Sequence, residues 1–339
     1  MTSLEGLDLV ALDRHLTEAG IPRTGELGAE YISGGASNLT FLVYDDVSKW
    51  VLRRPPLHGV TPSAHDMARE YRVVAALQDS AVPVARAVTL CDDDSVLGAP
   101  FQMVEYVPGR VIRHAGELEA LGDQRTIDGC VDALIRVLAD LHAVDPDAVG
   151  LADFGKPNGY LERQVRRWGS QWELIRFPDD PRDADVQRLH SILAQSIPSN
   201  SRSSIVHGDY RIDNTILDAT DATVVRAVLD WEMSTLGDPL SDAALMCLYR
   251  HPEFELVHSD AAWASPLIPT SDDLAQRYSL ASGQPLDHWD FYMGLAYFKL
   301  AIIAAGIDYR FRLGSGTADR SQVGEAVAPL IAQGLTTVS

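Results

Sequence analysis

Hydrophobic residues recur at helical spacing in three parts of the chain. Apolar positions three or four apart lie on one face of a helix, so these stretches predict amphipathic helices. The first spans residues 7–20, the second follows Asp66, and the third is the longest regular stripe. The positions that carry them are Leu9, Leu12 and Leu16; Met67, Tyr71, Val74 and Leu77; and Ile127, Val131, Leu134, Leu138 and Leu141.

Short runs rich in β-branched and aromatic residues predict strands in the first third of the chain. They cover residues 39–44, 49–54, 87–91 and 101–106, and Pro108-Gly109 ends the last of them. From residue 115 onward the pattern is mainly helical. We therefore expect an α+β fold, with a β-rich N-terminal lobe at 1–107 and a mainly helical C-terminal lobe at 108–339.

Composition and charge restrict the partners. The 339 residues are 46% hydrophobic and 22% charged, which is ordinary for a globular protein. The net charge of −20 argues against nucleic acid or an anionic membrane as a partner, because both reward basic patches. Cys91, Cys130 and Cys247 lie far apart and form no Cys-x-x-Cys pair, which fits a reducing cytoplasm.

Two further stretches bear on localisation. Glu5, Asp8 and Asp13 interrupt the apolar residues at the N-terminus, so this stretch does not read as a secretory signal. The run from Phe291 to Ile307 is the most apolar, but it is short and Lys299 lies in its middle. A buried core helix is the better interpretation. We expect a cytoplasmic protein without a membrane partner.

The stretch from Ile205 to Asn214 carries the candidate chemistry. Two apolar residues lead through His207 and a Gly turn to Asp209, and an amide, Asn214, follows five positions later. A second apolar run, 227–229, delivers another acid, Asp230. Asp209 can orient a hydroxyl and accept its proton, while Asn214 and Asp230 offer oxygen ligands to Mg²⁺. This set suits phosphoryl transfer from a nucleoside triphosphate.

The N-terminal lobe offers candidates for nucleotide binding. Glycine lets backbone N–H groups approach phosphate oxygens, and a hairpin containing Gly34 and Gly35 precedes the strand at 39–44. An ordinary hairpin turn is the alternative interpretation. Arg53 or its neighbour Arg54 can reach the phosphates, with Glu70 beside the helix stripe as its partner. The remaining candidates are Ser37 and Asn38 next to the glycines, and Glu105 and Val107 before the hinge, for an adenine edge.

In this order, the motifs resemble the aminoglycoside phosphotransferase-like family of the protein-kinase-like superfamily. His207-Gly208-Asp209 through Asn214 is similar to its catalytic loop, and Asp230-Trp231-Glu232 to its metal-binding segment. The runs 51–56, 63–67, 160–164 and 237–239 are most similar to the kinase-like domains found with acyl-CoA dehydrogenases. The resemblance spans about Tyr31 to Tyr309 and implies a bilobal kinase-like fold, with a single helix in the β-rich N-lobe. It also implies ATP and Mg²⁺ as cofactors.

One position departs from the family pattern. Protein kinase-like enzymes carry Lys on the third strand, where this chain has Arg53. Arg keeps the charge and binds phosphate bidentately, but it is not equivalent to Lys. We expect an ATP-dependent phosphotransferase that acts on a small-molecule hydroxyl. The alternative is a nucleotide-binding, pseudokinase-like regulatory module without efficient transfer. No clear Ala-Pro-Glu landmark follows Asp230, which disfavours a protein kinase.

The acceptor stays open between two classes. Acidic side chains at Glu232, Asp238 and Asp242 would suit an aminoglycoside-like amino alcohol, although Asp238 and Asp242 can equally cap and hold the helix after Pro239. The closer subgroup implies a hydroxyacyl or CoA-linked metabolite, whose anionic group Arg163 and Arg167 could bind. ATP versus GTP and the oligomeric state are not set by the sequence.

Overall fold

The computed structural model describes residues 4–32, 38–56, 66–199, 202–314 and 320–339. The chain divides into two compact units: an N-terminal unit, residues 1–109 with 226–234, and a C-terminal unit, residues 110–225 with 235–339. The expected boundary after residue 107 left the segment 226–234 in the second lobe. The structure places this segment in the N-terminal unit, where the Val228 N–H donates to the Pro83 carbonyl at 2.8 Å.

A five-stranded antiparallel sheet forms the N-terminal unit, in the order β1-β2-β3-β5-β4. The predicted hairpin is confirmed, since Tyr31 on β1 pairs with Phe41 on β2. The strands are β1 (Gly28–Tyr31), β2 (Leu39–Tyr44), β3 (Lys49–Arg54), β4 (Ala87–Cys91) and β5 (Phe101–Glu105). The four strands predicted from composition are thus present, with their ends within one residue.

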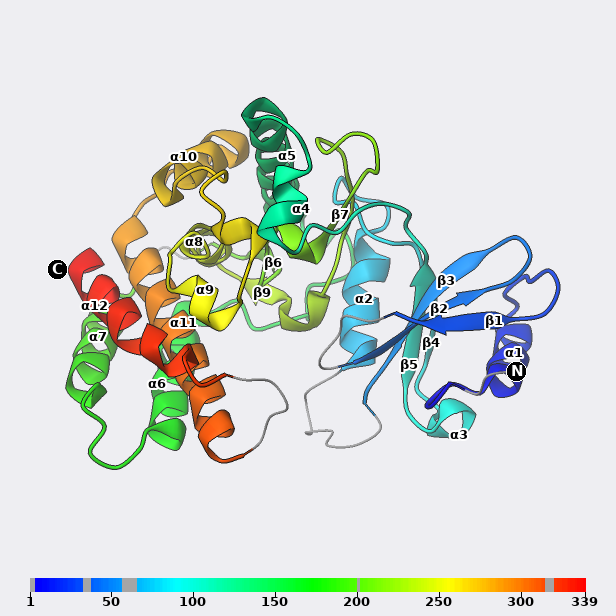
Figure 1. Ribbon diagram of the computed structural model, residues 1–339, viewed down its shortest axis with the longest axis horizontal. Coiled ribbons are helices and arrows are strands. Elements are labelled where there is room, and N and C mark those ends of the chain that lie inside the picture. The colour runs from blue at the N-terminus through cyan, green and yellow to red at the C-terminus, as the bar shows by residue number, and fades with distance from the viewer. Residues whose placement is uncertain (1–3, 33–37, 57–65, 200–201, 315–319) are drawn as a thin grey trace. The chain divides into compact units, whose positions relative to one another are not determined.

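Three helices accompany this sheet, and α2 lies on one side of it with α1 and α3 on the other (Figure 1). They are α1 (Leu9–Glu18), α2 (Met67–Leu77) and α3 (Asp94–Leu97). The Asp66 carboxylate begins α2 by accepting from the Arg69 N–H at 2.9 Å. The acidic segment 92–94 between β4 and β5 begins α3, where the Asp93 carboxylate accepts from the Ser95 N–H at 2.8 Å. The unit therefore has two helices beyond the one that the family resemblance implied.

Strand alternation sorts the side chains of β3 between the two faces of the sheet. Trp50 and Leu52 belong to the buried cluster that includes the α1 stripe. Val51, which lies between them, points to the α2 side of the sheet. The cluster consists of Leu7, Leu12, Leu16, Phe41, Val43, Trp50, Leu52, Cys91, Leu97, Phe101 and Met103. Arg54 shares the parity of Leu52, whereas Arg53 shares that of Val51, so the two arginines face opposite sides.

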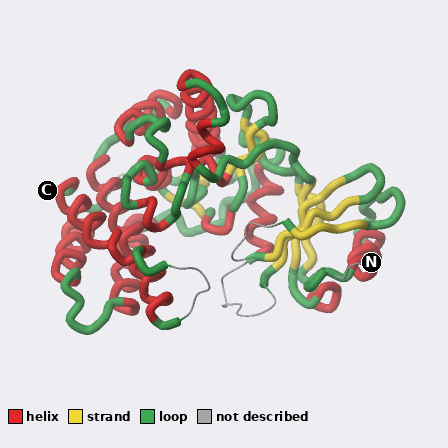
Figure 2. Tube along the Cα trace, in the orientation of Figure 1, coloured by secondary structure: helices red, strands yellow, loops and turns green. Residues whose placement is uncertain are grey.

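The C-terminal unit is mainly helical, as Figure 2 shows. The predicted stripe at 127–141 lies on α5, and all five of its apolar residues are buried. The α-helices are α4 (Ala115–Glu119), α5 (Gln124–Ala143), α6 (Tyr160–Ile175), α7 (Asp183–Gln195), α8 (Pro239–Leu248), α9 (Phe254–Val257), α10 (Ser271–Ser282), α11 (Trp289–Arg312) and α12 (Val327–Thr337). Short 3₁₀ turns are η1 (Ile212–Asn214), η2 (Trp231–Met233), η3 (Ala262–Ala264) and η4 (Val323–Ala326).

The most apolar helix, α11, is the centre of this unit. Among the described helices it is the one with the length and composition of a membrane span, yet 78% of its most apolar window is buried within the protein. Helices α6, α7, α8 and α12 pack against α11, and nearly every residue from Phe291 to Ala305 is buried. The predicted core helix is thus confirmed.

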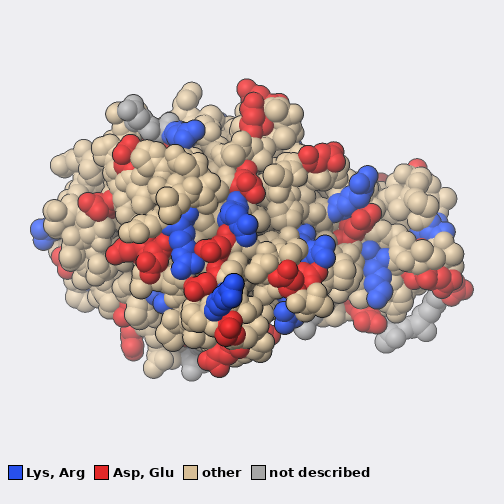
Figure 3. Space-filling view, turned by 90° about the horizontal axis from the view of Figure 1, so that it is seen from above, with Lys and Arg blue, Asp and Glu red and all other residues tan. Residues whose placement is uncertain are grey.

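Short strands carry the candidate motifs. β6 (Ser204–Val206) pairs antiparallel with β9 (Thr235–Gly237), and the loop containing His207, Gly208 and Asp209 follows β6 directly. β7 (Thr215–Leu217) follows η1, and β8 (Val225–Val228) precedes Asp230. On the face shown in Figure 3, acidic and basic side chains are interspersed.

Candidate active site

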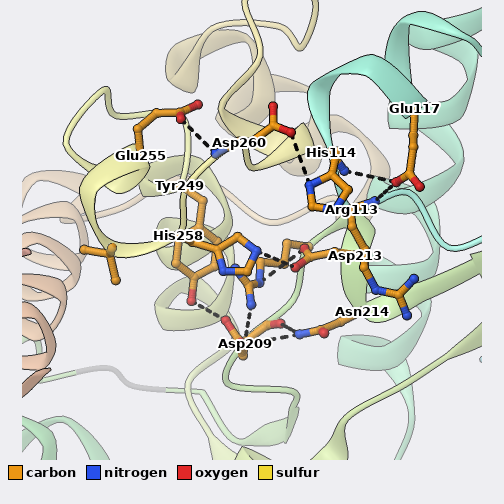
Figure 4. A network of polar contacts seen from close by, with 12 residues as sticks. Arg113, His114, Glu117, Asp209, Asp213, Asn214, Tyr249, Glu255, His258 and Asp260 are labelled. Carbon is orange, nitrogen blue, oxygen red and sulfur yellow. Dashed lines mark hydrogen bonds and ion pairs between the residues drawn. The ribbon is translucent and has the colours of Figure 1, made fainter. Parts of the chain in front are cut away.

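The loop after β6 brings Asp209 and Asn214 together, as their spacing predicted (Figure 4). The η1 turn reverses the chain, so the Asn214 amide lies beside the residue five positions earlier. Its Nδ2 donates to the Asp209 backbone carbonyl at 2.8 Å and to the carboxylate Oδ2 at 3.2 Å. The carbonyl oxygen of the same amide keeps its lone pairs for another partner.

Two more side chains contact the Asp209 carboxylate, one by a hydrogen bond and one by an ion pair. The Tyr249 hydroxyl donates to Oδ1 at 2.5 Å, and the Arg211 guanidinium lies 3.4 Å from Oδ2. Burial by itself raises the pKa of Asp209, but Arg211, Tyr249, His207 and Lys299 outweigh it and lower the pKa below its ordinary value. The carboxylate is therefore ionised at neutral pH, which is the state that a proton acceptor needs.

Arg211 is a further residue of the site, and it lies within the sequence motif although no role was expected for it. Its guanidinium lies 5.4 Å from the Tyr249 ring centroid and 5.5 Å from that of Phe254. It also pairs with Asp213 at 3.3 Å, and His258 lies 3.6 Å from the other oxygen of Asp213. Two rings and two carboxylates thus hold one cation beside Asp209. The sequence signal that could have indicated Arg211 is its position, two residues after Asp209 in the same loop.

Asp242 holds the backbone of the same loop. Its buried carboxylate accepts from the His207 N–H at 2.6 Å and the Gly208 N–H at 2.7 Å. His142, whose Nδ1 lies 2.7 Å from the Tyr278 hydroxyl, contacts the same carboxylate at 3.3 Å. Gly208 has φ +87°, a conformation that glycine adopts without strain. Asp242 therefore positions the catalytic loop.

Asp238 also has a structural task. It is the N-cap of α8, where Oδ1 accepts from the Leu240 N–H at 2.9 Å and Oδ2 accepts from the Tyr292 hydroxyl at 3.0 Å. Asp238 and Asp242 are each only 2% exposed. Of the two interpretations that the sequence left open, the structural one fits both residues, and neither is placed to attract a polycation from solvent.

The predicted pair on the nucleotide side is present within the N-terminal unit. Arg53 Nη1 lies 3.0 Å from Glu70 Oε2, and the Gln102 amide donates to the same oxygen at 2.8 Å. Burial raises the pKa of Glu70 to about 7, and the charge of Arg53 opposes the rise. Gln102 is opposite Arg53 in the register of β3 and β5, a relationship that no sequence motif indicated.

Arg54 is not the phosphate candidate. Its guanidinium is buried on the other face of the sheet and donates to the Gly6 and Leu97 carbonyls, at 2.6 Å each. Both acceptors are backbone oxygens at the ends of segments flanking α1 and α3. Arg54 thus joins three segments of the N-terminal unit, and the choice between the two arginines falls on Arg53.

Asp230 begins η2 in the left-handed region, with φ +63°. Few residues other than glycine adopt this conformation, and such positions cluster at functional sites. Its carboxylate is partly exposed, and Oδ1 lies 3.5 Å from Arg53 Nη2. The guanidinium of Arg53 therefore contacts both predicted acids, Glu70 and Asp230.

The remaining nucleotide-binding candidates are less defined. Asn38 is 3% exposed, and neither polar atom of its amide has a partner among the described residues. Glu105 ends β5, where its N–H donates to the Arg86 carbonyl at 2.8 Å, and Val107 follows two positions later. Gly34, Gly35 and Ser37 lie outside the described residues.

The oxygen donors suit a hard divalent cation. Asn214 offers a side-chain carbonyl oxygen, because its Nδ2 is the atom that binds Asp209. Asp230 offers a carboxylate with partly exposed oxygens. Magnesium takes carboxylate and carbonyl oxygens and keeps several waters. Among the described residues, no three His, Cys, Asp or Glu side chains gather into a metal-binding cluster.

The chain is similar to several known proteins. The family profile "Phosphotransferase enzyme family" matches residues 28–278. Mouse acyl-CoA dehydrogenase family member 10 is 36% identical over 92% of this chain, and human acyl-CoA dehydrogenase family member 11 is 32% identical over 96%. The chain spans 29% and 42% of the lengths of these relatives.

The chain is also similar to solved structures of aminoglycoside phosphotransferases. A putative aminoglycoside phosphotransferase from Ralstonia eutropha aligns over 98% of both chains with a TM-score of 0.84 and 32% identity. An aminoglycoside phosphotransferase in complex with ADP and hygromycin B aligns over 96% of this chain and 97% of its own, with a TM-score of 0.62 and 16% identity, which shows the shared kinase-like fold. The chain belongs to the phosphotransferase enzyme family.

Proposed function

We propose that this phosphotransferase is an ATP- and Mg²⁺-dependent kinase that transfers the γ-phosphoryl group to a hydroxyl of a small molecule. The observation that carries the proposal is the Asp209–Asn214 pair on the loop after β6. An ionised carboxylate beside an amide carbonyl places a proton acceptor next to a candidate metal ligand. Phosphoryl transfer requires such positioning and charge neutralisation more than covalent chemistry.

In the proposed reaction the acceptor oxygen forms a bond to the γ-phosphorus. The bond between that phosphorus and the oxygen bridging to the β-phosphate breaks, and ADP leaves with the electron pair. Asp209 orients the attacking hydroxyl and takes its proton. Arg211, held beside Asp209 by Tyr249 and Phe254, supports the ionised carboxylate throughout.

The nucleotide would be bound by the N-terminal unit. Arg53, oriented by Glu70, binds the α- and β-phosphates, since a guanidinium makes bidentate contacts with phosphate oxygens. Gly34, Gly35, Ser37 and Asn38 form the proposed phosphate-binding turn. Glu105 and Val107 supply backbone groups for the adenine edge. An aminoglycoside phosphotransferase of the same fold was solved in complex with ADP, which supports nucleotide binding.

Asn214 and Asp230 would hold Mg²⁺, which when bound neutralises charge on the transferring phosphates. The ion pair between Asp230 and Arg53 would loosen as phosphate oxygens become partners of the guanidinium. Three buried free cysteines support a reducing compartment, so we place the enzyme in the cytoplasm. Two acceptor classes are supported by the names of the relatives. The acyl-CoA dehydrogenase family members suggest a hydroxyacyl or CoA-linked metabolite, and the aminoglycoside phosphotransferase suggests an amino alcohol.

The test compares Asp209→Asn with Asp221→Asn, an exposed acid in the turn after β7. With Mg-ATP and a broad panel of alcohols, Asp209→Asn should lower turnover by about 10²–10⁴-fold, because a general base typically contributes that much. ATP binding should persist in both variants. Equal turnover in Asp209→Asn and wild type would remove the assignment, and binding without any phosphorylated product would favour the regulatory module.

A further inference from the structure

A pocket in the C-terminal unit opens beside the catalytic loop. Helices α6, α8 and α11 supply its walls, and Gly208, the residue before Asp209, forms part of its lining. The side chains that shape it are mostly aromatic and aliphatic: Tyr160, Trp168, Leu245, Tyr292 and Leu295. The pocket is small, so one terminal group of an acceptor, rather than a whole molecule, would lie in it against the backbone that carries Asp209.

Lys299 is the cation of this pocket. It lies on α11, where most neighbouring residues are buried and apolar. Its Nζ donates to the Gly208 carbonyl at 3.0 Å and lies 5.9 Å from the Trp168 ring centroid. An ammonium carries three donors, and across the described residues Lys299 makes this one hydrogen bond. Two donors are therefore available to an occupant of the pocket.

The charges around Lys299 do not remove this capacity. Burial lowers the pKa of Lys299, and Arg167 lowers it further, whereas the carboxylates of Asp209 and Asp242 raise it. These carboxylates already accept hydrogen bonds from other groups. Asp242 is occupied by the amides of His207 and Gly208, and Asp209 by Tyr249 and Asn214. Lys299 is thus the charged group in the pocket with donors left for a ligand.

We propose that Lys299 is a specificity-determining residue of the acceptor pocket: its free N–H groups bind an oxygen atom of the phosphoryl acceptor, and its charge disfavours acceptors that bring an ammonium there. The inference rests on the proposed kinase function. Because one N–H holds the Gly208 carbonyl, an oxygen bound by the others lies close to the loop of Asp209. A polycationic acceptor would place like charges together in a site where water screens them poorly.

The experiment uses three four-carbon alcohols that differ in one terminal group: hydroxybutyrate, butanediol and aminobutanol. Wild type should phosphorylate hydroxybutyrate with the highest kcat/KM and aminobutanol with the lowest. Lys299→Met should lower kcat/KM for hydroxybutyrate by about 10–100-fold, the worth of a hydrogen bond between charged groups. The same variant should raise kcat/KM for aminobutanol relative to butanediol and leave the KM for ATP unchanged.

Controls separate specificity from loop positioning. Lys299→Arg should keep the preference for hydroxybutyrate, and Arg166→Met, on the exposed side of α6, should behave as wild type. An equal loss for all three alcohols in Lys299→Met would overturn the proposal, because a residue that only positions the loop does not distinguish acceptors. If Lys299→Met does not fold, the wild-type order decides: preference for aminobutanol contradicts the inference.

Calorimetric titration distinguishes failure of the inference from failure of the kinase assignment. If wild type transfers phosphate to none of the three alcohols, loss of hydroxybutyrate binding in Lys299→Met would still support the pocket assignment. The broad alcohol panel would then decide the kinase assignment. A different outcome would refute only the inference about Lys299. In that outcome wild type phosphorylates butanediol or aminobutanol but does not bind hydroxybutyrate, with or without Mg-ATP.

Discussion

The guanidinium of Arg53 lies 3.0 Å from the Glu70 carboxylate, and the guanidinium of its neighbour Arg54 lies on the other face of the same sheet. Consecutive strand residues point to opposite faces, so adjacent arginines serve different tasks. Arg53 reaches the side of Glu70 and Asp230. Arg54 donates hydrogen bonds to backbone carbonyls on the side of α1 and α3.

Substitution of these two arginines should therefore have different effects. Arg53→Met should raise the KM for ATP by about 10–100-fold, since it removes hydrogen bonds to phosphate oxygens. Arg54→Met should leave that KM unchanged but lower the free energy of unfolding by about 1–3 kcal/mol, because it leaves the Gly6 and Leu97 carbonyls unpaired. Steady-state kinetics and urea unfolding measure the two quantities. A raised KM in Arg54→Met alone would reverse the assignment.

Glu70 should make stability depend on pH. Its pKa in the folded protein is about 7, above the ordinary 4.5, because burial penalises the charged carboxylate. The native state then binds a proton that the unfolded state releases, so stability should fall as pH rises from about 5 to about 8. Glu70→Gln should reduce this fall by about 1–3 kcal/mol.

Unfolding by urea at several pH values measures this dependence. Glu30→Gln is the matched control, since Glu30 is an exposed acid on β1 of the same sheet. It should retain the wild-type slope of unfolding free energy against pH. An identical slope in Glu70→Gln and wild type would show that Glu70 titrates normally.

Tyr249 should set the acid limb of the pH–rate profile. Its hydroxyl donates to Asp209 and is one of the groups that lower the pKa of this carboxylate against the effect of burial. Tyr249→Phe removes the donor, so the pKa of Asp209 should rise and the acid limb of kcat/KM should move to higher pH by about one unit. Tyr210→Phe is the control, because that buried hydroxyl donates to the Leu134 carbonyl instead. It should lower stability without moving the limb.

Asn214 should govern the magnesium requirement. Asn214→Ala removes both the proposed metal-binding oxygen and the Nδ2 donor to Asp209, so activation should need about 10–100-fold more Mg²⁺. Asn214→Asp keeps an oxygen ligand and should show a smaller shift. Titration of Mg²⁺ at saturating ATP measures the change, and a chelator should abolish turnover reversibly. An activation curve for Asn214→Ala that matches wild type would exclude Asn214 as a ligand.

Contacts within one short segment could be predicted, because the spacing of the residues along the chain determines them. Asp209 and Asn214 belong to one loop, and five residues with a Gly turn are enough to bring them together. The stripe of α5 and the burial of α11 follow from periodicity and composition alone. An ion pair between Glu70 and one of the two adjacent arginines was predicted from the strand and helix that carry them, and the structure shows it with Arg53. The α3 helix was missed, because a few acidic residues specify a turn and a helix start equally well.

The sequence by itself determined the family, the α+β fold class and four strands of the N-terminal unit, and it indicated the candidate residues of the loop after β6. Only the tertiary structure decided which arginine faces Glu70, since alternation separates the two side chains without saying which face α2 covers. It also decided the partners of the loop: Tyr249, Asp242 and Lys299 come from two distant helices and their ends. Their contacts arise from the packing of α8 and α11 in one core, and packing between distant segments leaves no fixed spacing along the chain.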